Sequence, residues 1–301
     1  MTVTENAQGA HEVGEKVILE ASNVTMRFGG LTAVADVSMQ VHDGEIVGLI
    51  GPNGAGKTTF FNCLTGMYIP TEGRVTLNGE QLPPKPLKVV QAGMARTFQN
   101  IRLFANMTAL ENVMVGRYCR TTSKALTSVL RGPKFRREED ATISRARELL
   151  EYVGLGDSAE HLARNLPYGD QRRLEIARAL GTSPRILLLD EPTAGMNPAE
   201  THEMTGLIRQ LRDELGITIL LIEHEMRVVM DISERITVLD YGERIAEGTA
   251  AEIQSDQRVI EAYLGKGAAE AEATRQAAAV AAGTEPATDA VEVATTPAEN
   301  D

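Results

Sequence analysis

Apolar and polar positions change their spacing several times along the 301-residue chain, and each change marks a predicted strand or helix. Residues 17–28 are strand-like, and residues 33–41 alternate between apolar and polar side chains, as a half-buried strand does. After a turn at residues 42–44, Glu45 leads into residues 46–50, an apolar run that is typical of a buried strand. The N-terminal part of the chain is therefore predicted to be a strand meander that leads into a glycine-rich loop.

A helical block interrupts the strand pattern in the middle of the chain. Its helices are predicted by apolar residues about 3.6 positions apart at residues 108–117, 136–153 and 170–180. The other strands are predicted at residues 73–77, 94–99, 185–190, 217–223, 235–239 and 244–246. The other helices are predicted at residues 57–66, 87–92, 198–215, 250–255 and 258–264, with a short one that ends at residue 230. This order predicts an α/β fold with an inserted helical subdomain at about residues 100–181.

The two ends of the chain show neither the alternation of a strand nor the 3.6-residue period of a helix. Residues 1–16 are polar and acidic, and residues 266–301 consist mostly of Ala, Glu, Thr and Val without a core pattern. Such segments bury too little apolar surface to fold, so we expect a disordered lead and a disordered tail. Between them, residues 17–265 are predicted to form one domain.

The charge balance argues against a nucleic-acid partner. The formal net charge is −12, of which −5 lies in residues 266–301 and −2 in residues 1–17. The remaining −5 leaves the body of the protein without the basic surplus of a nucleic-acid binder. Trp is absent and aromatic residues make up only 4%, which also argues against an aromatic platform for sugars or bases.

Hydropathy and cysteine usage are those of a cytoplasmic protein. The hydrophobic fraction of 43% and the charged fraction of 24% are typical of a soluble globular chain. No apolar run approaches the roughly 20 residues that cross a bilayer. Cys63 and Cys119 have no partners at metal-ligand spacing, so we interpret them as reduced thiols without a role in the chemistry.

The strongest chemical signal is the stretch EIVGLIGPNGAGKTT at residues 45–59, which fits the pattern G-x-x-x-x-G-K-T/S between a predicted strand and a predicted helix. Glycines let successive backbone N–H groups turn toward phosphate oxygens, and the helix dipole favours the same anion. Lys57 is predicted to reach the β- and γ-phosphates, and the Thr58 hydroxyl to bind Mg²⁺. The residues predicted to bind the nucleotide here are Gly51, Pro52, Asn53, Gly54, Ala55, Gly56, Lys57, Thr58 and Thr59. An ordinary glycine-rich turn is the alternative, but the lysine, the threonine and both flanks favour a nucleoside triphosphate site.

Two carboxylates follow the apolar run at residues 186–189. Asp190 and Glu191 are expected at the carboxyl end of a buried parallel strand, beside the phosphate loop. There Asp190 would bind Mg²⁺ through water, and Glu191 would orient or deprotonate the attacking water. A structural acidic pair is the alternative.

Three further positions are candidates for the same chemistry. Gln99, predicted to end a strand, could sense Mg²⁺ or the attacking water, or it could be an ordinary loop residue. Gly169 begins an amphipathic helix, whose N-terminus is either a second anion site or a capped surface helix. His224 ends another buried strand, where it could contact the γ-phosphate, although a lone histidine is more often structural.

Taken together, these residues resemble the ATP-binding cassette (ABC) ATPases over about residues 17–265. Residues 51–58 match the Walker A motif, Gln99 the Q-loop, 166–171 the signature motif, 186–191 Walker B, 194–197 the D-loop and His224 the switch histidine. Phe28 matches the aromatic residue that stacks on adenine in the family. The resemblance implies a P-loop NTPase fold with a RecA-like mixed core, an N-terminal antiparallel β subdomain and an inserted α-helical subdomain.

A closer resemblance is to the larger ATPase subunit of branched-chain amino acid importers. It is carried by RTFQNIRLF, the basic insertion at residues 121–137, LPYGDQRRLEIARAL and DEPTAGMNP. Relatives of that subfamily that handle urea, short amides or lipopolysaccharide export are alternatives. A soluble ABC ATPase acting on DNA or ribosomes is a weaker one, because this chain has one cassette, no sustained heptads and an acidic balance. A non-catalytic regulatory cassette is disfavoured by the intact Lys57, Asp190, Glu191 and His224.

The resemblance also implies the partners and the mechanism. Two cassettes would close on two ATP molecules with Mg²⁺, and Gly169 of one chain would contact the ATP bound by the other. Closure would act on two membrane permeases docked near Gln99 and the helical block. An external solute-binding protein would deliver the substrate to these permeases. The chain would lie as a peripheral subunit on the cytoplasmic face of the plasma (inner) membrane, without a nucleic-acid partner.

The signature motif departs from the family pattern. The usual Leu-Ser-Gly-Gly-Gln is Leu-Pro-Tyr-Gly-Asp at residues 166–170, and the D-loop carries Asn197 where Asp is usual. Pro167 has neither a hydroxyl nor an N–H for a γ-phosphate, and Asp170 adds negative charge beside an anion site. We therefore expect an asymmetric heterodimer with a second, more ordinary ABC ATPase subunit.

Overall fold

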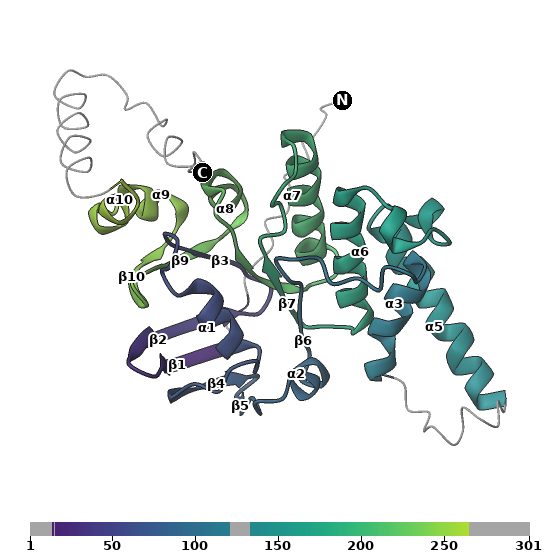
Figure 1. Cartoon of the computed structure of the whole chain (residues 1–301), viewed down its shortest axis with the longest axis horizontal. Coiled ribbons are helices and arrows are strands. Elements are labelled where there is room, and N and C mark those ends of the chain that lie inside the picture. The colour runs from purple at the N-terminus through teal and green to yellow at the C-terminus, as the bar shows by residue number, and fades with distance from the viewer. Residues whose placement is uncertain (1–13, 15, 121–132, 265–301) are drawn as a thin grey trace, which may run out of the picture.

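The computed structural model describes residues 14, 16–120 and 133–264. The expected disordered lead at residues 1–16 and tail at residues 266–301 therefore fall almost entirely outside the described residues, as does most of the basic insertion at residues 121–137. Two sheets and a group of helices make up the described part of the chain, and Figure 1 shows the helical group beside the sheets.

The N-terminal strands form an antiparallel sheet, as predicted. Its order is β2-β1-β4-β5, with β1 (Val17–Phe28) paired to β2 (Leu31–His42) on one side and to β4 (Glu72–Leu77) on the other. The short strand β5 (Glu80–Gln81) pairs with β4 after a tight turn that contains Gly79. This sheet is the N-terminal β subdomain that the sequence predicts.

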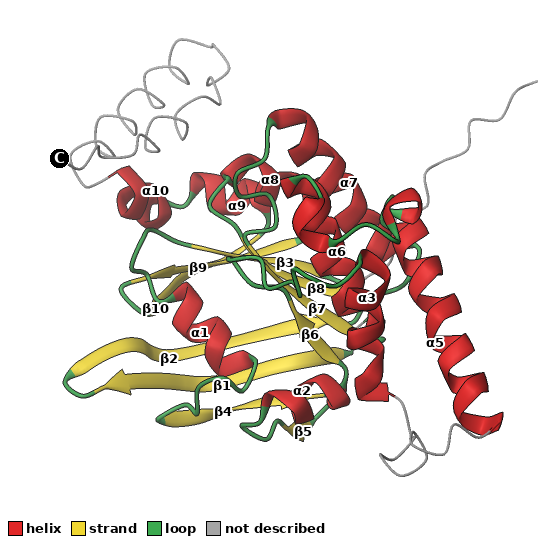
Figure 2. Cartoon of the chain, turned by 45° about the vertical axis from the view of Figure 1, so that its right-hand side comes forward, coloured by secondary structure: helices red, strands yellow, loops and turns green. Residues whose placement is uncertain are grey.

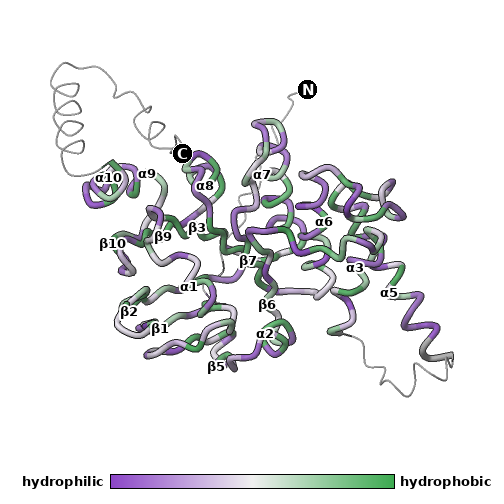
Figure 3. Tube along the Cα trace, viewed as in Figure 1, coloured by the Kyte–Doolittle hydropathy of each residue, from purple (hydrophilic) through white to green (hydrophobic). Residues whose placement is uncertain are grey.

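A second sheet of six strands forms the centre of the protein. Its order is β10-β9-β3-β8-β7-β6, parallel from β9 to β6 and closed by the antiparallel strand β10. In the same order, the strands are Glu243–Gly248, Arg235–Asp240, Ile46–Ile50, Thr218–Ile222, Ile186–Asp190 and Met94–Arg96. Every residue of β3, β7 and β8 is buried, which explains their unbroken apolar runs. Figure 3 shows these apolar strands at the middle of the trace.

The helices fall into two groups. Those of the core are α1 (Lys57–Leu64), α2 (Pro86–Ala92), α7 (Pro198–Asp213), α8 (Met226–Ile232), α9 (Ala250–Ser255) and α10 (Gln257–Leu264). Those of the inserted block are α3 (Ala109–Arg117), α5 (Pro133–Tyr152) and α6 (Tyr168–Gly181), with three 3-10 turns at Tyr118–Arg120, Gly156–Ser158 and Ala163–Asn165. Figure 2 shows α3, α5 and α6 together at one end of the molecule, as the predicted helical subdomain requires.

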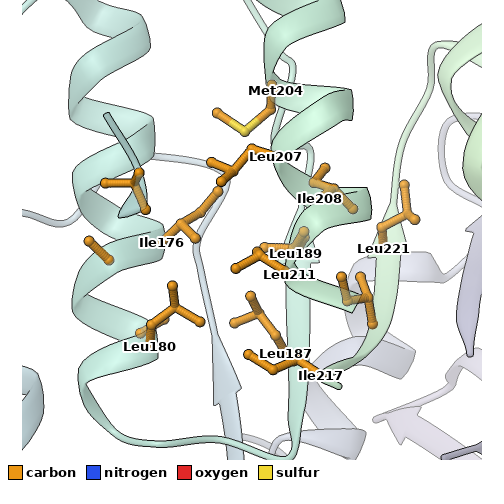
Figure 4. Close-up of a cluster of buried hydrophobic side chains, with 14 of the residues drawn as sticks. Ile176, Leu180, Leu187, Leu189, Met204, Leu207, Ile208, Leu211, Ile217 and Leu221 are labelled. Carbon is orange, nitrogen blue, oxygen red and sulfur yellow. The ribbon is translucent and has the colours of Figure 1, made fainter. Parts of the chain in front are cut away.

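The two faces of the mixed sheet pack into separate cores because successive side chains of a strand point in opposite directions. In β7, Leu187 and Leu189 pack with α6 and α7, whereas Ile186 and Leu188 pack with α1 and the antiparallel sheet. Figure 4 shows the first of these cores between α6, α7 and the strands. Its labelled residues are Ile176, Leu180, Leu187, Leu189, Met204, Leu207, Ile208, Leu211, Ile217 and Leu221.

One strand prediction is wrong at its end. The strand predicted at residues 94–99 stops at Arg96, so Gln99 lies three residues beyond β6 and does not end it. The Thr97 N–H still donates to the Leu188 carbonyl over 3.0 Å, but the next carbonyls bind Arg172 of α6. A side chain more than seventy positions away in sequence therefore ends this strand's pairing with β7.

A charged group at the amino end of the central sheet joins three strands. Glu45 precedes β3, is 4% exposed, and accepts two hydrogen bonds of 2.8 Å from Arg235 at the start of β9. Arg235 also donates to the Gln40 carbonyl in β2 over 2.6 Å. Burial alone would raise the pKa of Glu45, but the hydrogen bonds from Arg235 and His42 outweigh it and hold this pKa below its ordinary value.

We predict that Glu45→Gln destabilises the protein by about 2 kcal/mol at pH 7, because the bonds to a charged partner are weakened. Since folding lowers the pKa of Glu45, its contribution is present above the ordinary value of 4.5 and is lost as pH falls through the lower folded value. The difference in the free energy of unfolding between wild type and variant, measured with urea, should therefore become smaller below pH 4.5. The exposed Glu243→Gln is the matched control, and a gap that stays constant with pH would contradict the assignment.

Candidate nucleotide-binding and hydrolysis site

The glycine-rich loop joins β3 to α1, and its backbone fits tightly between two other strands. A Cβ on Gly51 would lie 2.1 Å from the Leu239 carbonyl oxygen, and one on Gly56 would lie 2.4 Å from the Ala33 carbonyl oxygen. Gly56 also has a φ of 95°, which a side chain disfavours. The sequence therefore needs glycine at both positions to bring the loop this close to β9 and β2.

Lys57 lies across the loop. Its Nζ donates to the carbonyls of Gly51 and Pro52 over 2.6 and 2.9 Å. Burial lowers the pKa of the Lys57 ammonium, and the charge of Glu191 opposes this effect. The N-cap of α1 is Gly56, which gives no side-chain cap, so the first N–H groups of the helix have no side-chain acceptor there. A cation and uncapped N–H groups in a glycine-rich loop fit the phosphates of a nucleotide.

The other residues predicted in this loop differ in exposure. Ala55 is buried and its carbonyl accepts from the Gly242 N–H over 3.0 Å, so its contribution comes from the backbone. Asn53, Gly54 and Thr58 are exposed, and Thr59 is half-buried. The Thr58 hydroxyl is thus accessible at the first turn of α1.

Asp190, the last residue of β7, is 3% exposed and paired with a cation. Arg96 at the end of β6 donates to its Oδ2 over 2.7 Å and to Asn62 Oδ1 in α1 over 2.6 Å. The guanidinium also lies 4.9 Å from the centre of the Phe61 ring. Sequence reasoning missed Arg96, although a lone arginine in a short apolar strand was a signal for a buried anionic partner.

Three predicted residues meet at one carboxylate oxygen. Gln99 donates from Nε2 to Oε2 of Glu191 over 2.9 Å, and His224 Nδ1 lies 3.7 Å from the same oxygen. Glu191 has a φ of 49°, an unusual value for a residue with a side chain, and its N–H donates to the Ile222 carbonyl over 2.9 Å. The structure therefore brings Gln99, Glu191 and His224 together, and their chemical roles stay predictions.

Glu223, which precedes His224, is a second residue that sequence reasoning missed. It is fully buried, and its Oε1 accepts from the N–H and the hydroxyl of Thr193 over 2.9 and 2.7 Å. Burial raises the pKa of Glu223, and the bonds from Thr193 oppose the shift. These bonds hold the end of β8 against the loop that follows Glu191.

The start of α6 lies beside the loop at residues 194–197. The Tyr168 ring is next to Gly195, where a Cβ would lie 3.4 Å from it, and a Cβ on Gly169 would lie 3.5 Å from Glu200 Oε1. Asn197 is the N-cap of α7 and accepts from the N–H groups of Ala199 and Glu200 over 2.9 and 3.0 Å. Because Asn and Asp cap helices equally well, the departure at position 197 leaves this loop intact.

Phe28 lies at the end of β1 and is 43% exposed. Its ring meets Tyr68 edge-on, with ring centres 5.4 Å apart and planes at 78°. An edge-to-face contact of this kind helps to fix the orientation of the Phe28 ring. The structure thus gives Phe28 the exposure that the predicted adenine contact requires.

Comparisons with known proteins agree with this geometry. The model of the ABC transporter family matches residues 34–194, and that of the branched-chain amino acid ATP-binding cassette transporter matches residues 243–269. The high-affinity branched-chain amino acid transport ATP-binding protein BraF of Pseudomonas aeruginosa is 50% identical over 83% of this chain and 98% of its own length. Its counterpart LivG of Escherichia coli K12 is 48% identical over the same shares. The lipopolysaccharide export ATP-binding protein LptB of Haemophilus influenzae is 36% identical, again over 83% and 98%.

Solved structures give the same result. A nucleotide-free ATP-binding cassette from an ABC transporter has a TM-score of 0.73 and 32% identity, and it covers 83% of this chain and all of its own. A dimeric cassette in a post-hydrolysis state with ADP and phosphate has a TM-score of 0.65 and 28% identity, and the match covers 77% of this chain and 99% of its own. Among the described residues, no helix has the length and apolar character needed to span a membrane. Since both sequence and fold match cassettes along most of its length, the chain belongs to the family of ATP-binding proteins of ABC transporters, which are ATPases.

Proposed function

We propose that this chain is the ATP-hydrolysing subunit of a membrane importer that takes up branched-chain amino acids through partner permeases. The observation that carries the hydrolytic role is the meeting of Gln99, Glu191 and His224 at one carboxylate oxygen. The substrate is supported by the names of the relatives BraF and LivG, and by the match of residues 243–269 to the branched-chain amino acid cassette family.

The phosphate loop binds the nucleotide in this proposal. Lys57 leaves the carbonyls of Gly51 and Pro52 and binds the β- and γ-phosphates, which are stronger acceptors because they are charged. The uncapped N–H groups at the start of α1 receive the remaining phosphate oxygens. The exposed ring of Phe28 stacks on adenine.

Oxygen-bearing side chains near the loop fit a magnesium ion. The Thr58 hydroxyl, the Asp190 carboxylate through water and the Gln99 amide oxygen are hard ligands of the kind that Mg²⁺ prefers. When bound, Mg²⁺ supplies charge that stabilises the β- and γ-phosphate oxygens. Arg96 donates to the Asp190 carboxylate and so holds it at the end of β7, beside the phosphate loop.

Glu191 is the general base in this proposal. Gln99 donates to its Oε2, so the carboxylate is held toward the segment that follows β6. His224 approaches the same oxygen from the end of β8, and its side chain remains half exposed for contact with a γ-phosphate. Positioning the water and the proton acceptor in this way accounts for most of what a protein contributes to phosphoryl transfer.

The start of α6 contributes to a partner's site. Gly169 and the N-terminal dipole of α6 face a nucleotide on a second cassette, while Pro167 offers neither a hydroxyl nor an N–H. The second cassette therefore supplies the better signature motif, which favours a heterodimer. Two permeases bind near Gln99 and the helical block, and the complex lies at the cytoplasmic face of the membrane.

We predict that Glu191→Gln keeps ATP affinity and lowers the turnover of ATP by at least about a hundredfold, because the amide cannot accept the proton of water. Phosphate release gives the turnover, and fluorescent-nucleotide titration gives the affinity. Glu203→Gln on α7 is the control, since Glu203 forms an exposed ion pair with Arg173 away from the proposed site. Turnover close to wild type in Glu191→Gln would rule out Glu191 as the base.

We predict that the purified chain without a second cassette hydrolyses ATP slowly, because both composite sites would then contain Pro167 and Asp170. Replacing both residues by the usual ones (Pro167→Ser with Asp170→Gln) should raise this activity by about tenfold or more, by restoring donors to the γ-phosphate. The measurement is phosphate release at matched concentrations, with size-exclusion chromatography to establish the oligomer. Full activity of the unaltered homodimer would contradict the asymmetric arrangement.

We predict that cells without this chain lose uptake of labelled leucine, isoleucine and valine. Restoring the wild-type chain should restore uptake, whereas restoring Glu191→Gln should not, since ATP hydrolysis drives the transport. Fractionation should find the chain with the membranes when its permeases are present. Normal uptake of all three amino acids, with loss of another substrate, would leave the ATPase intact and refute the proposed cargo.

A further inference from the structure

The segment from Thr97 to Arg102 connects the central sheet to the helical block and carries Gln99. After Thr97 its backbone has left β7, so another partner must satisfy its polar groups. That partner is the buried side of α6. The contacts come from three residues on successive turns of α6, namely Arg172, Glu175 and Arg178, of which Arg178 donates to the Arg102 carbonyl.

Arg172 binds two successive backbone carbonyls, those of Phe98 and Gln99. It is 3% exposed, and it donates from Nη1 to the Phe98 carbonyl over 2.8 Å and from Nη2 to the Gln99 carbonyl over 2.5 Å. Its Nη2 also donates to the Tyr168 hydroxyl over 3.0 Å. The planar guanidinium thus fixes two successive carbonyls at once, which a lysine cannot do.

Glu175 accepts the N–H groups of the same segment. It is 1% exposed, and its Oε1 lies 3.3 Å from the Phe98 nitrogen and 3.4 Å from the Arg102 nitrogen. Arg172 and Arg178 each approach this carboxylate to 3.6 Å. Burial raises the pKa of Glu175, and the charge of Arg178 is the largest opposing effect. Together, Arg172 and Glu175 bind both donors and acceptors of the Gln99 backbone region.

We propose that Arg172, with Glu175, positions Gln99 against Glu191 and thereby links α6 to the hydrolysis site of its own chain. The proposal rests on the proposed function, in which Gly169 at the start of α6 meets a partner's nucleotide. Gly169 and Arg172 lie three residues apart, on one helical turn, so they move together. A shift of α6 would therefore change the position of Gln99 beside Glu191.

A double-mutant cycle tests whether Arg172 acts through Gln99. The variants are Arg172→Gln, Gln99→Ala and the double variant, each as the full chain assembled with its transporter partners in membranes. Arg172→Gln should lower kcat by about tenfold while the KM for ATP changes less than about twofold, because only the positioning of a catalytic group is lost. In the Gln99→Ala background, Arg172→Gln should have almost no further effect, since coupled residues are not additive.

Arg173→Gln is the matched control, because Arg173 is the neighbouring arginine of α6 and pairs with Glu203. It should leave kcat, KM and the melting temperature close to wild type. Independent losses that multiply in the double variant, or a wild-type kcat in Arg172→Gln, would overturn the proposal. If Arg172→Gln does not fold, Arg172→Lys replaces it in the test, because lysine keeps the positive charge but lacks the planar guanidinium. The kcat of Arg172→Lys should lie between those of wild type and Arg172→Gln.

Amide hydrogen exchange tests the contact without any activity. Removing the Arg172 guanidinium should speed exchange at Phe98 and Arg102 in the chain without nucleotide, because Glu175 loses one of the two arginines that flank its carboxylate. Unchanged exchange in both Arg172 variants would overturn the proposal even if hydrolysis were impaired. Normal turnover in Glu191→Gln, by contrast, would remove Glu191 as the base in the proposed function while leaving this contact established.

Discussion

The parallel pairing of β3, β8 and β7 determines where each charged group of the site lies. Leu49 in β3 and Asp190 in β7 both pair with Ile222 in β8, so the three strands end at the same level. The phosphate loop, Glu191 and His224 follow these ends within two residues. Because all three strands are buried, a shift of register by one residue would turn their apolar side chains to the wrong face. The hydrophobic cores on both sides of the sheet therefore hold the site's geometry.

Placing charge at this buried edge has a free-energy cost, which the structure offsets with specific partners. Asp190 has Arg96, and Glu223 has both polar groups of Thr193. The backbone of Glu191 adopts a positive φ, a strain that costs about 1–3 kcal/mol and tends to occur where chemistry requires it. The bond from its N–H to the Ile222 carbonyl holds this conformation in place before a nucleotide arrives.

Local patterns predicted the features that depend on neighbouring residues. The apolar runs gave β3, β7 and β8, and the glycine spacing gave the phosphate loop and its helix, because period and turn chemistry are local properties. The partners of buried charges could not be predicted, since they come from distant parts of the chain. Arg96 and Asp190 are 94 positions apart, and Arg172 binds carbonyls more than 70 positions away. The end of the strand at residues 94–99 was predicted wrongly for the same reason, because the donor that binds its last carbonyls comes from the distant helix α6.

Helix α6 has an exposed first turn and a buried side. Pro167 and Tyr168 are exposed at its start, where the sequence departs from the family motif, whereas Arg172 and Glu175 are buried one turn further along. A substitution of Pro167 leaves in place the hydrogen bonds that Arg172 donates to the Gln99 segment. The reverse does not hold, because Arg172 also binds the Tyr168 hydroxyl and Tyr168 contacts Gly195. The departure at Pro167 is therefore compatible with the hydrogen bonds that Arg172 makes to the Gln99 segment of the same chain.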